Sequence, residues 1–346
     1  MFDSMSQRNR ADRLMNALLP ARLAVAAAAM LLLVLPAWGA DSAPASKSVA
    51  GAKLERVNFG SVSATATSWP MAVAKELKLD QKHGLDVTVF YTGGVSASIQ
   101  QLIAGSLDVA DSTMEQYLRS INQGIPAKII AGSVLPFPYL LIAKPEIKTL
   151  KDLKGHWMAL AAKKDPTYYL TAQALEKLGV KPDQWTASFA GSTTNRYAAL
   201  KSGGVDAAAL APPFSFTALR EGYHAVLDLS EVDPNYGFTA LGATEKTLKE
   251  NPGMVKALLK AYGEAVAWLL DVANETQAKQ ILIKMTKATP GDANDTYDLY
   301  VKKLKAFSPH GALPNRYVVG VQEQLVKLGD QQKVNEVGKY LWMPQN

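Results

Sequence analysis

The sequence contains no cysteine among its 346 residues. Without cysteine the chain can form no disulfide bond and no thiolate metal site, and it has no thiol nucleophile and no cysteine to carry a lipid. Histidine is also scarce, and the four histidines do not follow the HExxH spacing of zinc peptidases. They are His83, His156, His224 and His310. We interpret each as a surface or turn residue and predict no metal site.

Catalytic and cofactor motifs are missing as well. The GxGxxG fingerprint of dinucleotide-binding folds and the P-loop pattern are both absent. The segment Gly94–Ser98 resembles the nucleophile elbow GxSxG, but Ser98 stands where that motif requires its second glycine. We therefore predict no catalytic residue, no cofactor and no enzymatic activity.

Long tracts of one charge are absent too. Lys and Arg number 37 against 31 Asp and Glu, which gives a formal net charge of +6 at pH 7. The two signs are interspersed, and no basic or aromatic-basic stripe of the kind typical of nucleic-acid binding occurs. The sequence predicts a mildly basic, solvated surface and no nucleic-acid partner.

The main apolar run lies near the N-terminus, from Leu23 to Leu35, and is too short to span a bilayer comfortably. Arginines precede it, and the small residues of Ala-Trp-Gly-Ala follow it at positions 37–40, as in a secretory signal. We predict a cleaved signal peptide at residues 1–40 and a disordered leader at 41–54, with an uncleaved anchor as the alternative. In the absence of a lipid-bearing cysteine, this favours a soluble periplasmic protein.

A repeat offset by 98 positions organises the remaining chain. Residues 92–113 align without a gap on residues 190–211, so that Gly93 falls on Gly191 and Asp108 on Asp206. Each copy predicts a polar loop, a helix, a glycine turn and a buried strand. The first turn of such a helix has free N–H groups, so two copies indicate two polar-group sites facing one cleft. The two aspartates are predicted to hold turns.

Strand and helix patterns alternate from Arg56 to Ala243, and helical periodicity dominates from Glu245 onward. This order predicts an α/β fold with mainly parallel sheets flanked by helices and a helical C-terminal portion. About 300 residues follow the signal, which exceeds one ordinary core, so we expect two lobes. The segment Val134–Ala143, interrupted by Pro136 and Pro138, is interpreted as a crossing segment or an edge strand.

Several motifs together carry a resemblance to a known family. They are SATATSWP, HGLDV, TGGVSASIQQLIAGSLDVA, LKGHWMALAAKKDPTYYLTAQALEKLGV and AALKSGGVDAAALAPPF. Across residues 55–340 the chain resembles periplasmic substrate-binding proteins of ABC importers, in the nitrate, sulfonate and taurine group that also contains binders of the thiamine pyrimidine precursor. The resemblance implies a type II fold, in which two hinge strands join two lobes. We expect lobe 1 at 55–140 and 237–346, and lobe 2 at 141–236.

The resemblance also implies a function. Such proteins close on a small ligand and dock on a membrane permease that works with an ATPase, which predicts a monomeric carrier here. Two other functions stay open: an enzyme on the same fold acting on a pyrimidine or menaquinone precursor, and a soluble sensor subunit that presents its ligand. Helix N-termini, hydroxyls and aromatic residues together favour a small organic anion, a sulfonate or carboxylate with an apolar or aromatic body.

The resemblance places the ligand in a set of polar loops. The candidate residues are Ser63, Thr65, Thr67, Trp69, Gly93, Gly94, Ser96, Ser98, Ser112, Thr113, Lys163, Thr167, Tyr168, Ser192, Thr193, Asn195, Arg196, Pro212, Phe214 and Tyr236. For the helix-starting hydroxyls plain capping is the alternative, and for Trp69 it is core packing. The loop 162–165 lacks the glycine-serine pair of many relatives, which predicts a charged side chain in its place. Lys163 and Arg196 are the candidate cations.

Overall fold

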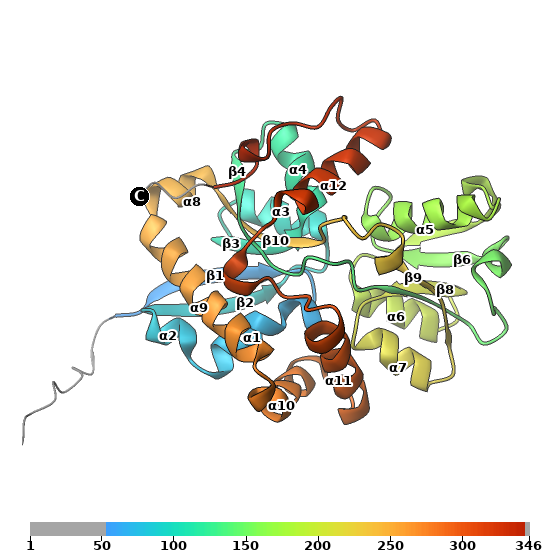
Figure 1. The fold of residues 1–346 in the computed structure, drawn as a ribbon, viewed down its shortest axis with the longest axis horizontal. Coiled ribbons are helices and arrows are strands. Elements are labelled where there is room, and N and C mark those ends of the chain that lie inside the picture. Colours follow the sequence, from blue (N-terminus) through green and yellow to red (C-terminus); the bar gives the residue numbers. More distant parts are fainter. Residues whose placement is uncertain (1–52, 343–346) are drawn as a thin grey trace, which may run out of the picture. The chain divides into compact units, whose positions relative to one another are not determined.

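The computed structural model describes residues 53–342. The predicted signal peptide at 1–40 and nearly all of the predicted leader lie outside the described residues. Figure 1 shows the described chain as helices arranged around two separate β-sheets.

The first sheet contains five strands. Their spatial order is β2 (Leu85–Tyr91), β1 (Glu55–Ser61), β3 (Val109–Thr113), β10 (Thr239–Thr244) and β4 (Ala127–Gly132). Strand β1 is parallel to β2 and β3, whereas β10 is antiparallel to β3 and β4. Four strands therefore run in one direction, and β10 runs against them.

The second sheet repeats this topology. Its spatial order is β7 (Thr186–Phe189), β6 (Trp157–Leu160), β8 (Ala207–Leu210), β5 (Leu140–Ala143) and β9 (His224–Asp228). Strand β6 is parallel to β7 and β8, whereas β5 is antiparallel to β8 and β9. In both mixed sheets the antiparallel strand is fourth in order, so the parallel direction predominates as predicted.

Helices cover the sheets. The first sheet carries α1 (Trp69–Glu76), α2 (Leu79–Lys82), α3 (Val95–Ile103) and α4 (Met114–Asn122), and the second carries α5 (Pro166–Lys177), α6 (Thr193–Lys201) and α7 (Phe214–Arg220). Several helix starts follow local sequence rules. Pro70 and Pro166 lie in the first turns of α1 and α5, where a missing N–H costs nothing, and the hydroxyls of Thr113 and Ser192 cap α4 and α6.

The helical C-terminal portion returns to the first sheet, as predicted. It comprises α8 (Glu245–Glu250), α9 (Pro252–Leu270), α10 (Glu275–Thr286), α11 (Pro290–Tyr297) with a π-helix at Asp298–Lys303, and α12 (Asn315–Lys327). Helix α9 lies against α1 and α2, and α12 lies against α4 (Figure 1). We call the first sheet with α1–α4 and α8–α12 the first lobe, and the second sheet with α5–α7 the second lobe. The lobe boundaries given above, residue by residue, stay a prediction.

The two repeat aspartates hold equivalent positions in the two lobes. Asp108 precedes β3, and its Oδ2 accepts a hydrogen bond of 2.8 Å from the backbone N–H of Asn58 in β1. Asp206 precedes β8, and its Oδ2 accepts one of 3.0 Å from the backbone N–H of Trp157 in β6. Each aspartate therefore fastens the turn after its helix to the neighbouring parallel strand of its own sheet. Both side chains are structural, as predicted.

Two crossing segments, residues 133–139 and 229–238, join the lobes. The first connects β4 to β5, and the second connects β9 to β10. The segments are hydrogen-bonded to each other near both ends, where Phe238 N–H donates to the carbonyl of Leu135 and Leu229 N–H donates to the carbonyl of Tyr139, each at 2.9 Å. They form the two-stranded hinge that the resemblance implied.

Candidate ligand-binding site

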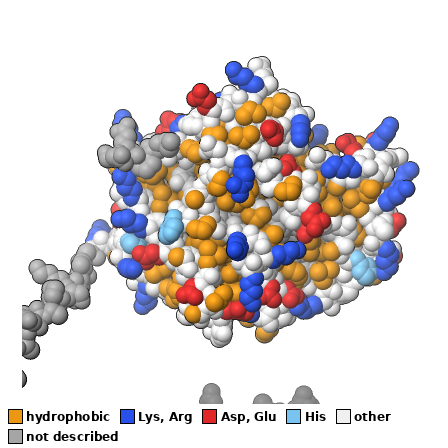
Figure 2. Space-filling model, in the orientation of Figure 1, with side chains coloured by type: hydrophobic (Ala, Val, Ile, Leu, Met, Phe, Trp, Pro, Cys, Tyr) orange, Lys and Arg blue, Asp and Glu red, His pale blue; other side chains and the backbone are white. Residues whose placement is uncertain are grey.

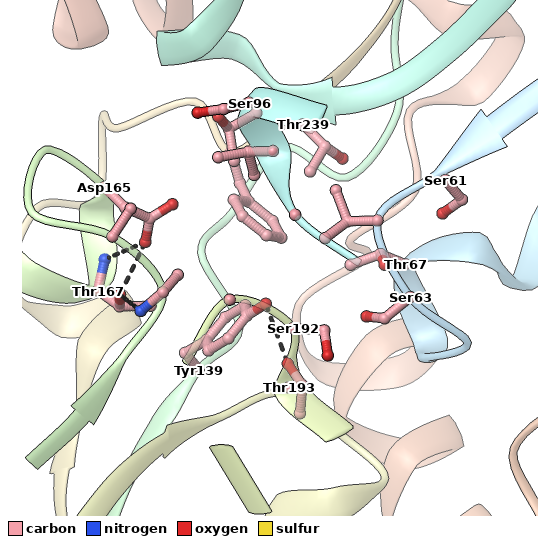
Figure 3. A pocket seen from close by; sticks show the side chains of 18 of the residues that line it. Ser61, Ser63, Thr67, Ser96, Tyr139, Asp165, Thr167, Ser192, Thr193 and Thr239 are labelled. Carbon is pink, nitrogen blue, oxygen red and sulfur yellow. Dashed lines mark hydrogen bonds between the residues drawn. The ribbon is translucent and has the colours of Figure 1, made fainter. Parts of the chain in front are cut away.

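A cavity of about 200 Å³ lies where loops of both lobes and both crossing segments meet. The first lobe contributes Ser61, Val62, Ser63, Thr67, Gly94, Val95, Ser96, Ala97, Asp111, Thr113 and Thr239; the second contributes Ala161, Ala162, Asp165, Thr167, Gly191, Ser192, Thr193 and Arg196; and the crossing segments contribute Phe137, Tyr139 and Phe238. Figure 3 shows Ser61, Ser63 and Thr67 on one side of this cavity and Asp165 with Thr167 on the other. The loops come from the carboxyl ends of β1, β3 and β6, the usual place for ligands in open α/β sheets.

The first-lobe wall is made of small and hydroxyl residues. Gly94 precedes α3 without any side-chain cap, and Ser96 in the first turn of that helix lines the cavity. The leading N–H groups of a helix have no intrahelical carbonyl to bond, and they lie at the positive end of the helix dipole. This wall therefore offers backbone N–H groups and hydroxyls to a polar ligand atom.

The second-lobe wall adds a guanidinium group. Arg196, in the first turn of α6, is only 2% exposed. Its Nη1 donates to the carbonyl of Gly191 at 2.8 Å and its Nη2 to the hydroxyl of Thr193 at 2.9 Å, while its Nε has no hydrogen-bond partner among the described residues. The guanidinium carbon lies 5.5 Å from the centroid of the Tyr139 ring. Arg196 is thus a buried, rigidly held cation at the cavity.

Two buried carboxyl groups also line the cavity, one in each lobe. Asp165 caps α5, because its Oδ1 accepts hydrogen bonds from the backbone N–H of Thr167 at 2.9 Å and from the Thr167 hydroxyl at 2.7 Å. Burial raises the pKa of Asp165, and the positive charge of Arg196 acts against that rise. Asp111, within β3, accepts a hydrogen bond of 2.9 Å from the hydroxyl of Ser133. Burial raises the pKa of Asp111 to about 7.

Aromatic rings from the crossing segments form the apolar part of the cavity. Phe137 and Tyr139 stack with ring centroids 4.6 Å apart, and Phe238 meets Phe137 edge-on at 4.7 Å. Because these rings belong to the hinge, a ligand that contacts them also contacts the segments that couple the two lobes. Phe137 and Tyr139 were not predicted to bind the ligand, whereas Phe238 ends a loop, 236–238, that the resemblance implied to face it.

The two lobes touch at the equivalent glycines of the repeat. A Cβ added to Gly191 would lie 2.9 Å from the carbonyl oxygen of Gly93. Nearby, the backbone N–H of Ala66 in the first lobe donates to the carbonyl of Pro212 in the second at 3.2 Å. The cavity is therefore closed over by direct backbone contact between the lobes.

Ion pairs join the lobes outside this contact. Arg220 of α7 pairs with Asp292 of α11 at 2.6 Å and with Asp295. Lys164 of the second lobe pairs with Asp330 of the first. These pairs add charge complementarity to the closed arrangement.

Nine of the twenty predicted residues line the cavity. They are Ser63, Thr67, Gly94, Ser96, Thr113, Thr167, Ser192, Thr193 and Arg196. The other eleven do not: Thr65, Trp69, Gly93, Ser98, Ser112, Lys163, Tyr168, Asn195, Pro212, Phe214 and Tyr236. Which residues contact a ligand stays a prediction.

Four predicted aromatic residues contact protein groups instead of the cavity. Trp69 is fully buried, donates from Nε1 to the carbonyl of Ala278 at 3.1 Å, and meets Tyr297 and Phe307 edge-on. Tyr168 lies beside Trp185 and Phe189, and Phe214 lies beside Tyr197. The hydroxyl of Tyr236 donates to Glu115 Oε2 at 2.9 Å. Trp69 therefore has the core-packing position that the sequence left as its alternative.

The remaining predicted residues outside the cavity make local contacts or face solvent. The hydroxyls of Ser98 and Thr92 are 2.5 Å apart, those of Thr65 and Thr67 are 2.8 Å apart, and Ser112 donates to the carbonyl of Val95 at 3.5 Å. The backbone N–H of Asn195 donates to the Ser192 hydroxyl at 3.3 Å. Gly93 and Pro212 contribute the interlobe contacts described above. Lys163 is exposed.

The described surface offers two further observations. Over residues 53–342 no helix is long and apolar enough to cross a bilayer, and no cluster of three or more His, Asp or Glu could hold a metal ion. On the face shown in Figure 2, basic and acidic side chains are interspersed among apolar ones rather than gathered into a patch of one sign.

Comparison with known proteins identifies the family. The family model described as NMT1/THI5 like matches residues 66–276, which include most of the cavity lining. The chain belongs to this family. The resemblance that the motifs carried is thereby confirmed at the level of family and fold.

Individual relatives are more distant. A protein of Brucella abortus (strain 2308), provisionally named a binding protein, is 28% identical over 271 residues, covering 75% of this chain and 81% of the relative. The alkanesulfonate-binding protein SsuA of Xanthomonas axonopodis pv. citri, solved bound to MOPS, superposes with a TM-score of 0.68 at 18% identity, covering 84% of this chain and 99% of that one. The periplasmic aliphatic sulphonate binding protein SsuA of Escherichia coli gives a TM-score of 0.65 at 18% identity, covering 84% and 93%. At these identities the solved structures show the shared fold alone.

Proposed function

We propose that this chain is a periplasmic solute-binding protein of an ABC import system, which captures a small organic acid between its lobes and delivers it to a membrane permease with its ATPase. The observation that carries the proposal is the closed cavity, in which two helix N-termini and a buried arginine face aromatic rings of the hinge. A ligand held there contacts both lobes and the segments that connect them. Ligand binding would therefore stabilise the closed arrangement that a permease can recognise.

The lining groups favour an organic acid over a small inorganic anion. Hydroxyls, free helix N–H groups and Arg196 suit the oxygens of a sulfonate or carboxylate. Phe137, Tyr139 and Phe238 supply an apolar surface that nitrate or bicarbonate would leave unused. The names of the related sulfonate-binding proteins point in the same direction.

A carrier fits the cavity better than an enzyme. Cysteine is absent from the chain, and no histidine lines the cavity within the described residues. The cavity carboxyls already accept hydrogen bonds from Thr167 and Ser133 and have no nucleophile activated beside them. We therefore propose binding and release without chemical change.

Isothermal titration of the mature protein tests the proposal. The panel contains ethanesulfonate, benzenesulfonate and benzoate as organic acids, with nitrate and bicarbonate as inorganic anions. We expect at least one organic acid to bind with a micromolar or lower Kd and the inorganic anions to bind much more weakly. Binding of inorganic anions alone would contradict the proposed ligand class, and turnover of a bound acid by the purified protein would contradict the carrier role. Mass spectrometry of protein purified gently from periplasm should detect the natural ligand.

A further inference from the structure

The carboxylate of Asp165 faces the cavity and could accept a hydrogen bond that a ligand with only an acid group cannot donate. Asp165 is 6% exposed, and its Oδ1 is fully engaged by Thr167. Its Oδ2 forms no hydrogen bond with any of residues 53–342, and Figure 3 shows that oxygen directed away from Thr167 toward the cavity. Leaving a carboxylate oxygen without a donor is costly once a ligand excludes water from the cavity, so the ligand itself is expected to supply that donor.

The direction of the hydrogen bonds around Asp165 is fixed by its neighbours. The Thr167 hydroxyl accepts a bond of 2.9 Å from the backbone N–H of Ala161, so its own hydrogen points to Asp165 Oδ1. Oδ1 thus receives two donors and must be an acceptor. The second terminal atom of the side chain faces the cavity. In aspartate this atom is an oxygen that accepts a hydrogen bond, whereas in asparagine it would be an amide N–H₂ group that donates one.

The charges of the lining also call for a donor on the ligand. Arg196 is the single Lys or Arg among the residues that line the cavity, whereas Asp111 and Asp165 both line it. Asp111 is the poorer candidate, because its unpartnered Oδ1 is shielded from the cavity surface as well as from solvent. Asp165 is therefore the carboxyl group that a ligand can reach.

We propose that Asp165 is a specificity-determining residue, and that it selects a ligand carrying an N–H donor, an amine or an amino-substituted ring, in addition to its acid group. The acid end lies at the helix N-termini and Arg196, and the donor end lies at Asp165 Oδ2. The inference rests on the proposed function and deepens it, because it divides organic acids into those that satisfy Asp165 and those that leave it unpaired.

Matched ligand pairs test the inference by titration calorimetry. Each pair differs by one amino group: 2-aminoethanesulfonate against ethanesulfonate, and 3-aminobenzenesulfonate against benzenesulfonate. In the wild-type protein we expect the amino member of at least one pair to bind about tenfold more tightly or better, the usual effect of a hydrogen bond to a buried charge. Equal or tighter binding of the amino-free members overturns this inference and leaves the proposed function standing. Failure of these four acids and of benzoate to bind overturns the proposed function and this inference together, whereas binding of benzoate without any of the four overturns this inference alone.

The variant Asp165→Asn sharpens the test. Asparagine keeps the cap on Thr167 and turns its N–H₂ toward the cavity, so we expect the preference to disappear: the amino member loses about tenfold in affinity, and the amino-free member changes by less than about threefold. An unchanged ratio, or an equal loss for both members, assigns Asp165 a purely structural role and overturns the inference.

Asp228→Asn is the matched control. Asp228 accepts the same pair of hydrogen bonds from the residue two positions later, at 3.0 Å from the backbone N–H of Ser230 and at 2.6 Å from its hydroxyl. Asp228 does not line the cavity. We expect Asp228→Asn to change thermal stability about as much as Asp165→Asn and to leave the affinity ratio of each ligand pair unaltered. A shift in that ratio in the control would assign the effect to the loss of a negative charge at any such cap and overturn the inference.

Discussion

The two lobes share a strand–loop–helix unit, but the residue before the helix proline has a different role in each lobe. In the first lobe β1 leads through a polar loop to α1, and in the second β6 leads through a polar loop to α5; in both, a proline lies in the first turn. The residue before the proline differs. In the first lobe it is Trp69, which turns into the core against Ala278, and in the second it is Asp165, which caps α5 at the cavity. Equivalent positions can therefore hold the fold in one lobe and face the ligand in the other.

The two cavity carboxyls extend the comparison. Asp165 has the guanidinium of Arg196 close enough to lower its pKa against the effect of burial, whereas for Asp111 only hydrogen bonds from Ser133 and Thr239 oppose burial. The second-lobe wall thus carries charges of both signs, and the first-lobe wall carries hydroxyls, N–H groups and one carboxyl without a cation. We expect the first lobe to give contacts common to many acids and the second to give most of the selectivity.

The largest expected effect comes from the glycine contact between the lobes. Gly191→Ala places a methyl group 2.9 Å from the Gly93 carbonyl, a distance that real Cβ atoms essentially never show, so the lobes cannot reach full closure. We expect a loss of affinity of about a hundredfold, or about 3 kcal/mol, for the tightest-binding acid, measured by calorimetry.

Gly203→Ala is the control for this variant. Gly203 occupies the same left-handed region, with φ +76° against +69° for Gly191, but a Cβ there meets nothing within 4 Å. Both variants carry the strain of a positive φ, about 1–2 kcal/mol, and only Gly191→Ala carries the interlobe clash. Equal affinities of the two variants would show that closure does not depend on this contact.

Trp69→Phe tests whether Trp69 stabilises the core of the first lobe or contacts the ligand. The change removes the donor to the Ala278 carbonyl and leaves a void beside Tyr297 and Phe307, so we expect a loss of about 2–3 kcal/mol in the free energy of unfolding, measured with urea. Ligand affinity should change by less than about twofold. Trp157→Phe, at a position 52% exposed in the second sheet, should cost no more than about 0.5 kcal/mol. A tenfold loss of affinity in Trp69→Phe would place Trp69 at the ligand after all.

Asp111→Asn tests the carboxyl that has no cation. Because the pKa of Asp111 is raised to about 7 in the folded protein, above its ordinary value of 3.8, the folded state binds the proton more tightly than the unfolded chain. Its contribution to stability is full at low pH and is lost as the pH rises through about 7. Asparagine does not titrate, so the variant should gain about 2 kcal/mol relative to wild type between pH 5 and pH 8, measured by urea unfolding at both. A difference that stays constant with pH would contradict the raised pKa.

The sequence predicted the fold well because the signals that define it are local. The proline and hydroxyl positions that start α1, α5 and α6, and the turn aspartates Asp108 and Asp206, act within a few residues or within one repeat unit. The repeat itself predicted that two equivalent helix starts would face one cleft.

The parts of the site that the sequence did not predict depend on distant contacts. The direction of Trp69 is decided by the carbonyl of Ala278, 209 positions away. Phe137 and Tyr139 reach the cavity because their crossing segment is hydrogen-bonded to the segment that ends at Phe238. The sequence periodicity of a stretch interrupted by prolines cannot indicate this pairing. Arg196 was one of two predicted cations, and its hydrogen-bond partners Gly191 and Thr193 lie within five positions of it.

The smallest effect is expected at Lys163, which the sequence could not distinguish from Arg196 as a candidate cation. Lys163 is exposed and forms no ion pair within residues 53–342, so Lys163→Ala should change the unfolding free energy by no more than about 0.5 kcal/mol and the affinity for an acid by no more than about twofold. Arg196→Lys keeps the charge but replaces the planar fork, whose two Nη atoms bond Gly191 and Thr193, by a single nitrogen atom, so it should lose about tenfold in affinity. If calorimetry gave the larger loss to Lys163→Ala, the cation that pairs with the ligand would lie on the exposed loop, and the buried guanidinium would serve the fold of α6 alone.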